Sequence, residues 1–97
     1  MRLRFTPQAT RDIAEIADTI RAENPVAAQR VRGSILDSLS MLTQFPLIGR
    51  AQSVEGVRKI ITRRYRYLVY YTIDDARDEV IVLTVQHPSR DQRMENE

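Results

Sequence analysis

The chain has 97 residues, a formal net charge of +2 and no cysteine, so it supports one domain with a small core and excludes disulfides and thiolate chemistry. No apolar run approaches the roughly 20 residues that a membrane-spanning helix needs, and the N-terminus lacks the apolar region of a secretory signal. We therefore predict a single cytoplasmic domain over residues 1–97, with no membrane partner.

The chain begins with a short strand and a helix. Residues 2–5, RLRF, alternate charged and apolar side chains, which predicts an edge strand. Thr6 is a good helix N-cap, and Pro7 suits the first helical position. Apolar residues then recur at helical spacing, which predicts a helix as far as about Glu23.

A second helix follows with almost no connection. Asn24 and Pro25 repeat the start signal, and the apolar stripe continues until the chain reaches Pro46. Two helices joined so closely form an antiparallel αα-hairpin. We expect Gly33, in the middle of the second helix, to allow close packing of the pair.

The second half of the chain indicates strands. Residues 45–50 indicate a turn with an apolar anchor, and 51–56 a polar loop. The stretch 57–71, VRKIITRRYRYLVYY, is rich in β-branched and aromatic residues. It predicts strands at 57–65 and 66–73, with a turn or bulge near Tyr65.

The last predicted strand is the most regular one. Residues 74–78 indicate an acidic hairpin turn, and 79–87, EVIVLTVQH, a strand that Pro88 ends. Residues 88–97 indicate a loose polar tail. The order β-α-α-β-β-β predicts an α+β fold, in which an antiparallel four-stranded sheet carries the αα-hairpin on one face.

Charge is distributed unevenly along this chain. Between residues 50 and 66 six basic residues accompany the single acid Glu55, whereas 74–79 holds four acids and Arg77. A positive region implies an anionic partner, either nucleic acid or an acidic protein segment, and the alternative is a solvated strand face. We expect Arg58, Arg64 and Arg66 to gather on the free face of the sheet. The residues expected to bind a partner are Arg58, Lys59, Arg63, Arg64, Arg66 and Tyr67.

Four pieces of the chain, taken in order, resemble the RelE/ParE superfamily of bacterial toxins. These are RLRFTPQATRDIAEIADTI, ENPVAAQRVRGSI, FPLIGR followed by VEGVRKI, and YRYLVYYTID followed by EVIVLTVQHPSR. The resemblance implies a small toxin of a type II toxin–antitoxin system, neutralised by a cognate antitoxin that wraps it with a helix and an extended segment. The Tyr-x-Tyr-x-x-Tyr-Tyr strand and the His-Pro-Ser-Arg ending are more similar to the ParE and plasmid-stabilisation branch.

The resemblance implies one of two activities, which need different residues. RelE-like members cut mRNA on the ribosome, whereas ParE-like members inhibit DNA gyrase. RNA cleavage without a metal needs a base, an acid and cations. Here the candidates are His87 as the group that titrates near neutrality, with Arg63, Arg64 and Arg90 on phosphate. Glu55, Tyr65 or Tyr67 would be the second proton carrier.

Other interpretations of these residues stay open. His87 is the only histidine and could instead be a strand-end residue bonded to a backbone carbonyl. Tyr67 could pack within the sheet or, on an open face, stack on a base or contact a protein. No cofactor or metal is expected. We expect a gyrase inhibitor, and the alternatives are a ribosome-dependent mRNA endonuclease and a degenerate toxin that acts only through antitoxin binding.

Overall fold

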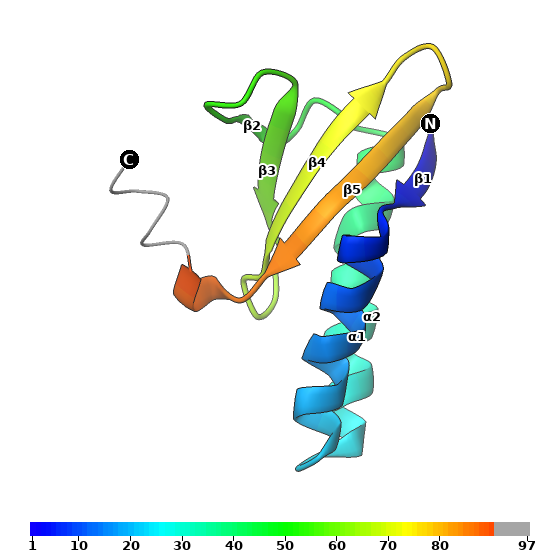
Figure 1. Ribbon diagram of the computed structural model, residues 1–97. Helices are drawn as coiled ribbons and strands as arrows, with labels where there is room; N and C mark the ends of the chain where they lie inside the picture. Colours follow the sequence, from blue (N-terminus) through cyan, green and yellow to red (C-terminus); the bar gives the residue numbers. More distant parts are fainter. Residues whose placement is uncertain (91–97) are drawn as a thin grey trace.

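The computed structural model describes residues 1–90 and has two helices beside one sheet (Figure 1). The expected α+β class is confirmed. The elements are β1 (Arg2–Phe5), α1 (Pro7–Arg21), α2 (Pro25–Ser40), the 3-10 turn η1 (Met41–Thr43), β2 (Arg50–Ala51), β3 (Val57–Ile61), β4 (Leu68–Asp74), β5 (Glu79–Gln86) and the 3-10 turn η2 (Pro88–Arg90). Of the expected loose tail, residues 88–90 form η2 and the rest lies outside the described residues.

The sheet has five strands in the order β1-β5-β4-β3-β2. It differs from the expected four-stranded antiparallel sheet in two ways. β1 runs parallel to β5, with Phe5 opposite Val82, and β2 adds a two-residue strand antiparallel to β3. The parallel pair is possible because β1 and β5 are joined through both helices and strands β2 to β4, a connection far longer than the dozen or so residues that parallel neighbours need. Residue alternation within one strand carries no information about that direction.

Both predicted helix starts are confirmed. The Thr6 side chain accepts a hydrogen bond from the backbone N–H of Ala9 at 3.0 Å, and Asn24 accepts one from Ala27 at 3.1 Å. Each cap is followed by proline at the first helical position. Local side-chain chemistry therefore determines where both helices begin. Within residues 1–90, neither helix combines the length and the apolar character needed to cross a membrane.

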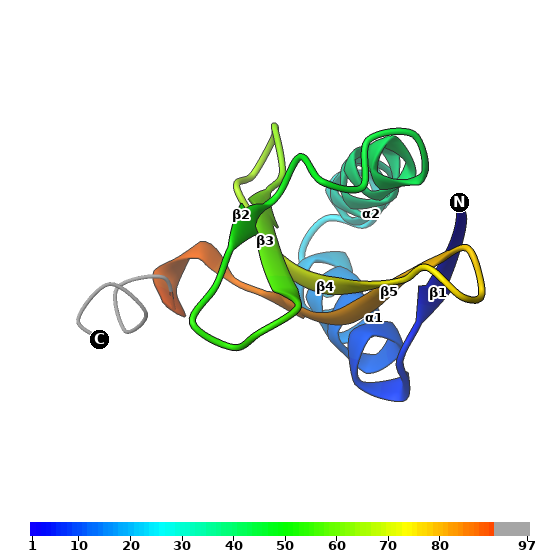
Figure 2. The ribbon, with the colours of Figure 1, turned by 90° about the horizontal axis from the view of Figure 1, so that it is seen from above.

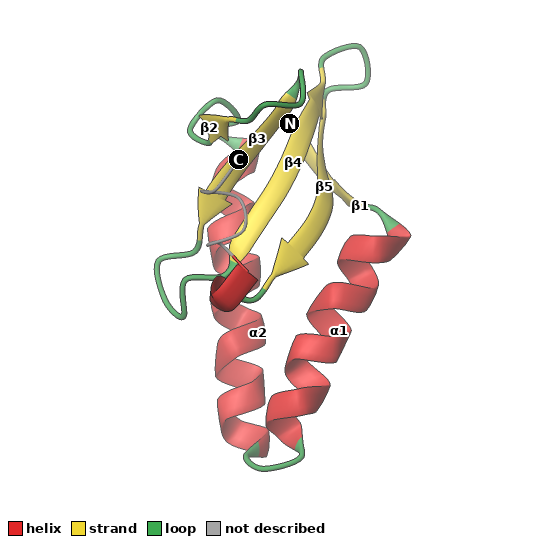
Figure 3. Ribbon diagram, turned by 60° about the vertical axis from the view of Figure 1, so that its left-hand side comes forward, coloured by secondary structure: helices red, strands yellow, loops and turns green. Residues whose placement is uncertain are grey.

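The two helices meet the sheet differently (Figures 2 and 3). α2 lies against one face, whereas α1 runs alongside β5 beyond the end of β1. Asp12 of α1 accepts hydrogen bonds from the Thr84 hydroxyl at 2.6 Å and from the Val85 N–H at 3.0 Å. A carboxylate on α1 therefore satisfies backbone and side-chain groups at the part of the β5 edge that β1 does not reach.

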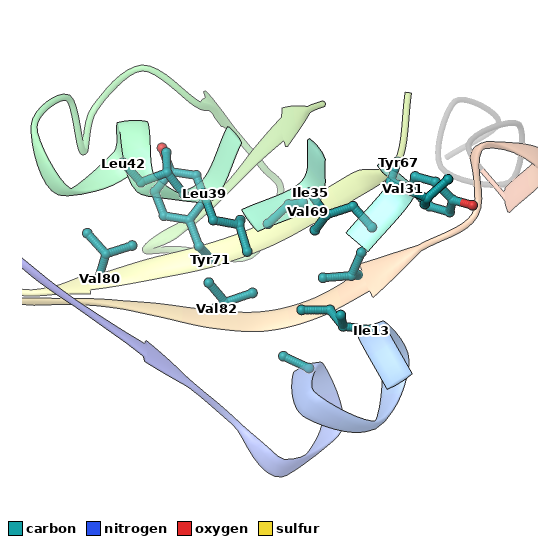
Figure 4. Close-up of a cluster of buried hydrophobic side chains, with 12 residues drawn as sticks. Ile13, Val31, Ile35, Leu39, Leu42, Tyr67, Val69, Tyr71, Val80 and Val82 are labelled. Carbon is teal, nitrogen blue, oxygen red and sulfur yellow. The ribbon is translucent and has the colours of Figure 1, made fainter. Parts of the chain in front are cut away.

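One hydrophobic cluster joins both helices to the sheet (Figure 4). Its buried members are Ala9, Ile13, Val31, Ile35, Leu39, Leu42, Tyr67, Val69, Tyr71, Val80, Val82 and Val85. A register shift in the pairing of β4 with β5 at Tyr70 and Tyr71 brings both Val82 and Val85 to this face. Leu68 and Tyr70 alternate with the core residues and are also buried. The opposite face of β4 is therefore not simply exposed, as the sequence interpretation assumed.

Gly33 does not have the expected packing role. A Cβ atom added at this position would meet nothing within 4 Å. The expectation that Gly33 allows close approach of the helices is therefore wrong, because the glycine faces open space.

Candidate functional site

The connection between β3 and β4, residues 62–67, is a tight and strongly basic loop. Tyr65 and Arg66 have φ angles of 64° and 55°, in the left-handed region. The turn predicted near Tyr65 is confirmed, and both strands stop short of it, since β3 ends at Ile61 and β4 begins at Leu68. The loop exposes Arg63, Arg64 and Arg66 to solvent.

Thr62 fixes the shape of this basic loop. Thr62 is only 1% exposed, and its hydroxyl donates to the Arg64 carbonyl at 2.7 Å and accepts from the Tyr67 N–H at 2.9 Å. The Thr62 N–H also donates to the Tyr67 carbonyl at 2.9 Å. Thr62 therefore closes the loop and positions three guanidinium groups. The sequence analysis missed it, although a threonine before a turn is a known local hydrogen-bonding signal.

A groove of about 570 Å³ runs between the end of α2, η1 and the outer edge of β3. We call it the basic groove. Its lining includes the cations Arg50, Lys59, Arg63 and Arg66 and the apolar side chains Met41, Leu42, Ile48, Ile60 and Ile61. Arg63 and Arg64 also line a neighbouring hollow with Asp37 of α2. The basic residues therefore gather beside α2, and the groove places a hydrophobic surface among them.

The expectation that Arg58, Arg64 and Arg66 share a free sheet face is wrong. Arg58 stands opposite Tyr71 in the ladder and points to the same side as that core residue. Its guanidinium donates to the Leu47 carbonyl at 3.3 Å and to the Gly49 carbonyl at 2.7 Å. The register between β3 and β4 places Arg58 on the side of the protein interior. The sequence of β3 alone does not specify that register.

Tyr71 holds the segment 45–49 against the sheet from the same side. Its hydroxyl donates to the Pro46 carbonyl at 2.7 Å and accepts from the Gly49 N–H at 2.8 Å. A Cβ on Gly49 would collide with this hydroxyl and lie 2.7 Å from the ring carbon Cε1, so the close approach requires glycine. Burial raises the pKa of Tyr71, with opposing contributions from Gly49 and Arg58.

The anchored segment presents apolar side chains to solvent. Phe45, Leu47 and Ile48 are 57%, 67% and 56% exposed. We call these three residues the apolar knuckle. Large apolar groups exposed together on an anchored segment are typical of an interaction surface. Ile48 also lines the basic groove, so the two surfaces are continuous.

His87 comes directly after β5 and is not among the residues that line the basic groove or the hollow with Asp37. Its Nδ1 accepts a hydrogen bond from the Ser89 N–H at 3.1 Å and lies 3.0 Å from the Ser89 hydroxyl. Its ring meets Tyr67 edge-on, with centroids 5.8 Å apart. His87 is thus a strand-end residue with a backbone partner, although that partner is an N–H group and not the expected carbonyl.

Tyr67 is on the covered side of the sheet. It is 6% exposed and belongs to the hydrophobic core, so it has no open face on which a base could stack (Figure 4). Burial and, to a smaller extent, nearby Tyr65 raise its pKa. Tyr67 and His87 line a cavity of about 560 Å³ with Asp12 and Glu15 of α1.

The predicted catalytic residues do not line one common hollow. Arg63 and Arg64 share the hollow beside α2, whereas His87 lines the cavity beside α1. Glu55 is exposed in the turn before β3. Arg90 ends η2, which lies in front of the sheet when α2 lies behind it (Figure 3), and its side chain is outside the described part. Among the described residues, no three His, Cys, Asp or Glu side chains cluster as metal ligands.

Comparisons with known proteins agree with this architecture. Residues 3–92 match the family model described as "ParE toxin of type II toxin-antitoxin system, parDE". A Sinorhizobium fredii protein named Putative toxin Y4kP is 34% identical over 86 residues, covering 89% of this chain and 86% of that protein.

Solved structures of the same architecture include two toxin–antitoxin systems. The chromosomal ParDE system from P. aeruginosa gives a TM-score of 0.78 at 22% identity, over 90% of this chain and 95% of that chain. The RelBE2 complex from Mycobacterium tuberculosis gives 0.66 at 28% identity, over 89% and 95%.

Proposed function

Because the chain belongs to the ParE toxin family of type II toxin–antitoxin systems, we propose that it arrests growth by inhibiting DNA gyrase and is silenced by a cognate antitoxin. In this proposal the toxin acts by binding, without a catalytic step of its own. The partner surface consists of the basic loop, the basic groove and the apolar knuckle.

The separation of His87 from the loop arginines carries the choice of gyrase over mRNA. A ribonuclease must place a proton-transfer group and cations around one phosphate. Here His87 and Arg63 line different cavities, and His87 Nδ1 is engaged by Ser89. This geometry supports a binding surface better than it supports a shared catalytic centre.

Surface chemistry supports the antitoxin partner. The solved relatives are described as ParDE and RelBE toxin–antitoxin systems. The basic groove combines cations with apolar side chains, and the apolar knuckle adjoins it. Of the expected partner residues, Arg58 and Tyr67 point inward, which leaves Lys59, Arg63, Arg64 and Arg66 for direct contact.

A supercoiling assay tests the gyrase proposal. Purified protein is added to gyrase, ATP and relaxed plasmid, and we expect negative supercoiling to fall as the toxin reaches stoichiometric amounts. The same inhibition is expected for His87→Ala, because the histidine has no catalytic role in this proposal. Unchanged supercoiling at a stoichiometric excess would contradict it.

The cavity shared by His87 and Tyr67 favours a second candidate, a ribosome-dependent mRNA endonuclease. Histidine is the side chain that most often transfers protons in enzymes, and the His87 ring meets the Tyr67 ring edge-on. Primer extension on mRNA after induction would then give discrete new 5′ ends, and His87→Ala would remove them. Full growth arrest by His87→Ala would exclude this role for the histidine.

The growth of cells after induction distinguishes an active toxin from a degenerate one that only binds its antitoxin. Such a protein would be well behaved alone and would not arrest cells on induction. The exposed apolar knuckle favours the opposite outcome, since uncovered apolar surface promotes association. We expect poor solubility alone and good solubility when the protein is produced with its partner.

A further inference from the structure

The four residues at the tip of the basic loop, 63–66, are three arginines and one tyrosine. Two of them, Tyr65 and Arg66, have φ angles of 64° and 55°, where asparagine and glycine are the usual turn residues. Larger side chains in this region strain the backbone, and such strain is found preferentially at binding and catalytic sites. The requirements of the turn therefore do not explain these side chains, and a ligand would.

The basic loop presents the four side chains to solvent on an ordered backbone. All four residues are exposed, and Tyr65 is 44% exposed. The buried Thr62 closes the loop through its hydrogen bonds to Arg64 and Tyr67. The loop projects sideways from the end of the sheet (Figure 3). A ligand therefore meets an aromatic ring and cations without having to order the backbone that carries them.

The guanidinium groups of the loop are available to an anionic ligand. The ion pairs in the described part of the chain involve arginines of β1, α1 and the β4–β5 turn, and none involves a loop arginine. Asp37 of α2 lines a hollow with Arg63 and Arg64 without pairing with either there. Guanidinium groups bind phosphate oxygens through two parallel N–H donors. Three of them in four residues suit the successive phosphates of a nucleic acid strand.

The tyrosine discriminates between the possible anionic ligands. Proteins that bind single-stranded nucleic acid combine cations that follow the phosphates with aromatic rings on which bases stack. Tyr65 stands between Arg64 and Arg66 in the chain, so the loop contains both parts. Duplex DNA keeps its bases stacked on one another, and an acidic peptide has no bases. Neither of these ligands would use the exposed ring in this way.

We propose that the basic loop binds single-stranded DNA. The guanidinium groups of Arg63, Arg64 and Arg66 contact phosphates, and the Tyr65 ring stacks on one base. This contact needs neither the basic groove nor the apolar knuckle. That the strand is part of the DNA held by gyrase rests on the proposed function, whereas the binding of a free strand to the loop does not.

Fluorescence anisotropy with a labelled oligothymidylate tests the phosphate contacts on the full chain, made by cell-free synthesis. Three contacts predict a slope of about −2 when the logarithm of the binding constant is plotted against that of the salt concentration. Arg64→Gln/Arg66→Gln should weaken binding by at least about tenfold and flatten this slope. Arg30→Gln/Arg32→Gln, at exposed positions on α2, is the matched control. Equal loss in both double variants would reduce the effect to net charge and overturn the proposal.

The stacking contact has its own pair of variants. Tyr65→Ser should weaken binding by at least about fivefold, whereas Tyr65→Phe keeps the ring and should stay within about twofold of the original. An oligonucleotide carrying iodouracil should form its photochemical crosslink at Tyr65, located by mass spectrometry of the digested complex. Undiminished binding of Tyr65→Ser, or a crosslink confined to another part of the chain, would overturn the proposal.

Competition experiments distinguish the other anionic ligands. Duplex DNA and polyglutamate should each displace the labelled strand only at higher concentrations than unlabelled oligothymidylate. Stronger displacement by polyglutamate would identify an acidic protein segment as the ligand, and stronger displacement by oligouridylate would identify RNA, and either result would overturn the proposal. Gyrase is absent from these assays. Inhibition of gyrase without binding of the strand would therefore contradict only the loop proposal, and binding without inhibition only the proposed target.

Discussion

Tyr71 connects the sheet to the apolar knuckle through a single hydroxyl group. Tyr71→Phe would leave the buried Gly49 N–H and the partly buried Pro46 carbonyl without this partner. We expect the free energy of unfolding to fall by about 1–3 kcal/mol, the usual cost of unsatisfied buried polar groups. Urea denaturation measures it, and Tyr65→Phe, at a half-exposed position, should change stability by less than about 0.5 kcal/mol.

Two tyrosines also make the stability of the protein fall at alkaline pH. Burial raises the pKa of both Tyr67 and Tyr71 above the ordinary value of 10.0. A raised pKa means that the fold favours the neutral phenol, so this contribution is complete below pH 10 and is lost as pH rises through the folded-state pKa. Urea unfolding at a series of alkaline pH values should show falling stability, and Tyr67→Phe should make the fall less steep. A slope unchanged by that substitution would contradict this assignment.

Replacing Gly49 or Gly33 by alanine should change stability in opposite directions. Gly49→Ala should destabilise the protein, because the new Cβ would strike the Tyr71 ring and its hydroxyl. Gly33→Ala should stabilise it by up to about 1 kcal/mol, because alanine is the better helix former and the space is open. Thermal unfolding of both variants checks the pair, and equal effects of the same sign would contradict the packing described.

At the scale of elements, the basic loop depends on Thr62. Thr62→Val keeps the shape of the side chain but removes the hydroxyl bonds to Arg64 and Tyr67. We expect faster amide hydrogen exchange at Tyr67 and a stability loss of about 1–3 kcal/mol. Thr62→Ser keeps the hydroxyl and should preserve most of the protection. Equal exchange in the two variants would show that the hydroxyl does not hold the loop.

Elements with local signals could be predicted from the sequence. The helices begin where Thr6 and Asn24 supply caps, and the turn at Tyr65 interrupts a run of strand-forming residues. The parallel pairing of β1 and the short β2 could not be predicted in this way, because both depend on contacts between distant segments.

The candidate site was predictable in composition but not in arrangement. The excess of basic residues between 50 and 66 predicts a charged region, and Arg63 and Arg66 both line the basic groove. Cross-strand register decides that Arg58 and Tyr67 point inward, and the position of α2 decides where the groove lies. The separation of His87 from the arginines likewise follows from tertiary structure.

At the scale of the whole molecule, the candidate proton-transfer residues and the candidate partner surface line different hollows. The basic groove and the apolar knuckle adjoin each other around α2 and β3, whereas His87 and Tyr67 line the cavity beside α1. A protein built in this way can present a continuous charged and apolar surface to a partner without assembling a proton-transfer centre there. This separation is the basis for expecting inhibition through binding.

The topology of a reporter plasmid, extracted from cells after induction of the toxin, tests that central claim most directly. We predict progressive loss of negative supercoiling on chloroquine gels as growth stops, with the same change for His87→Ala, while mRNA from the same cultures keeps its normal 5′ ends. Growth arrest with unchanged plasmid topology and new mRNA ends that require His87 would contradict the account.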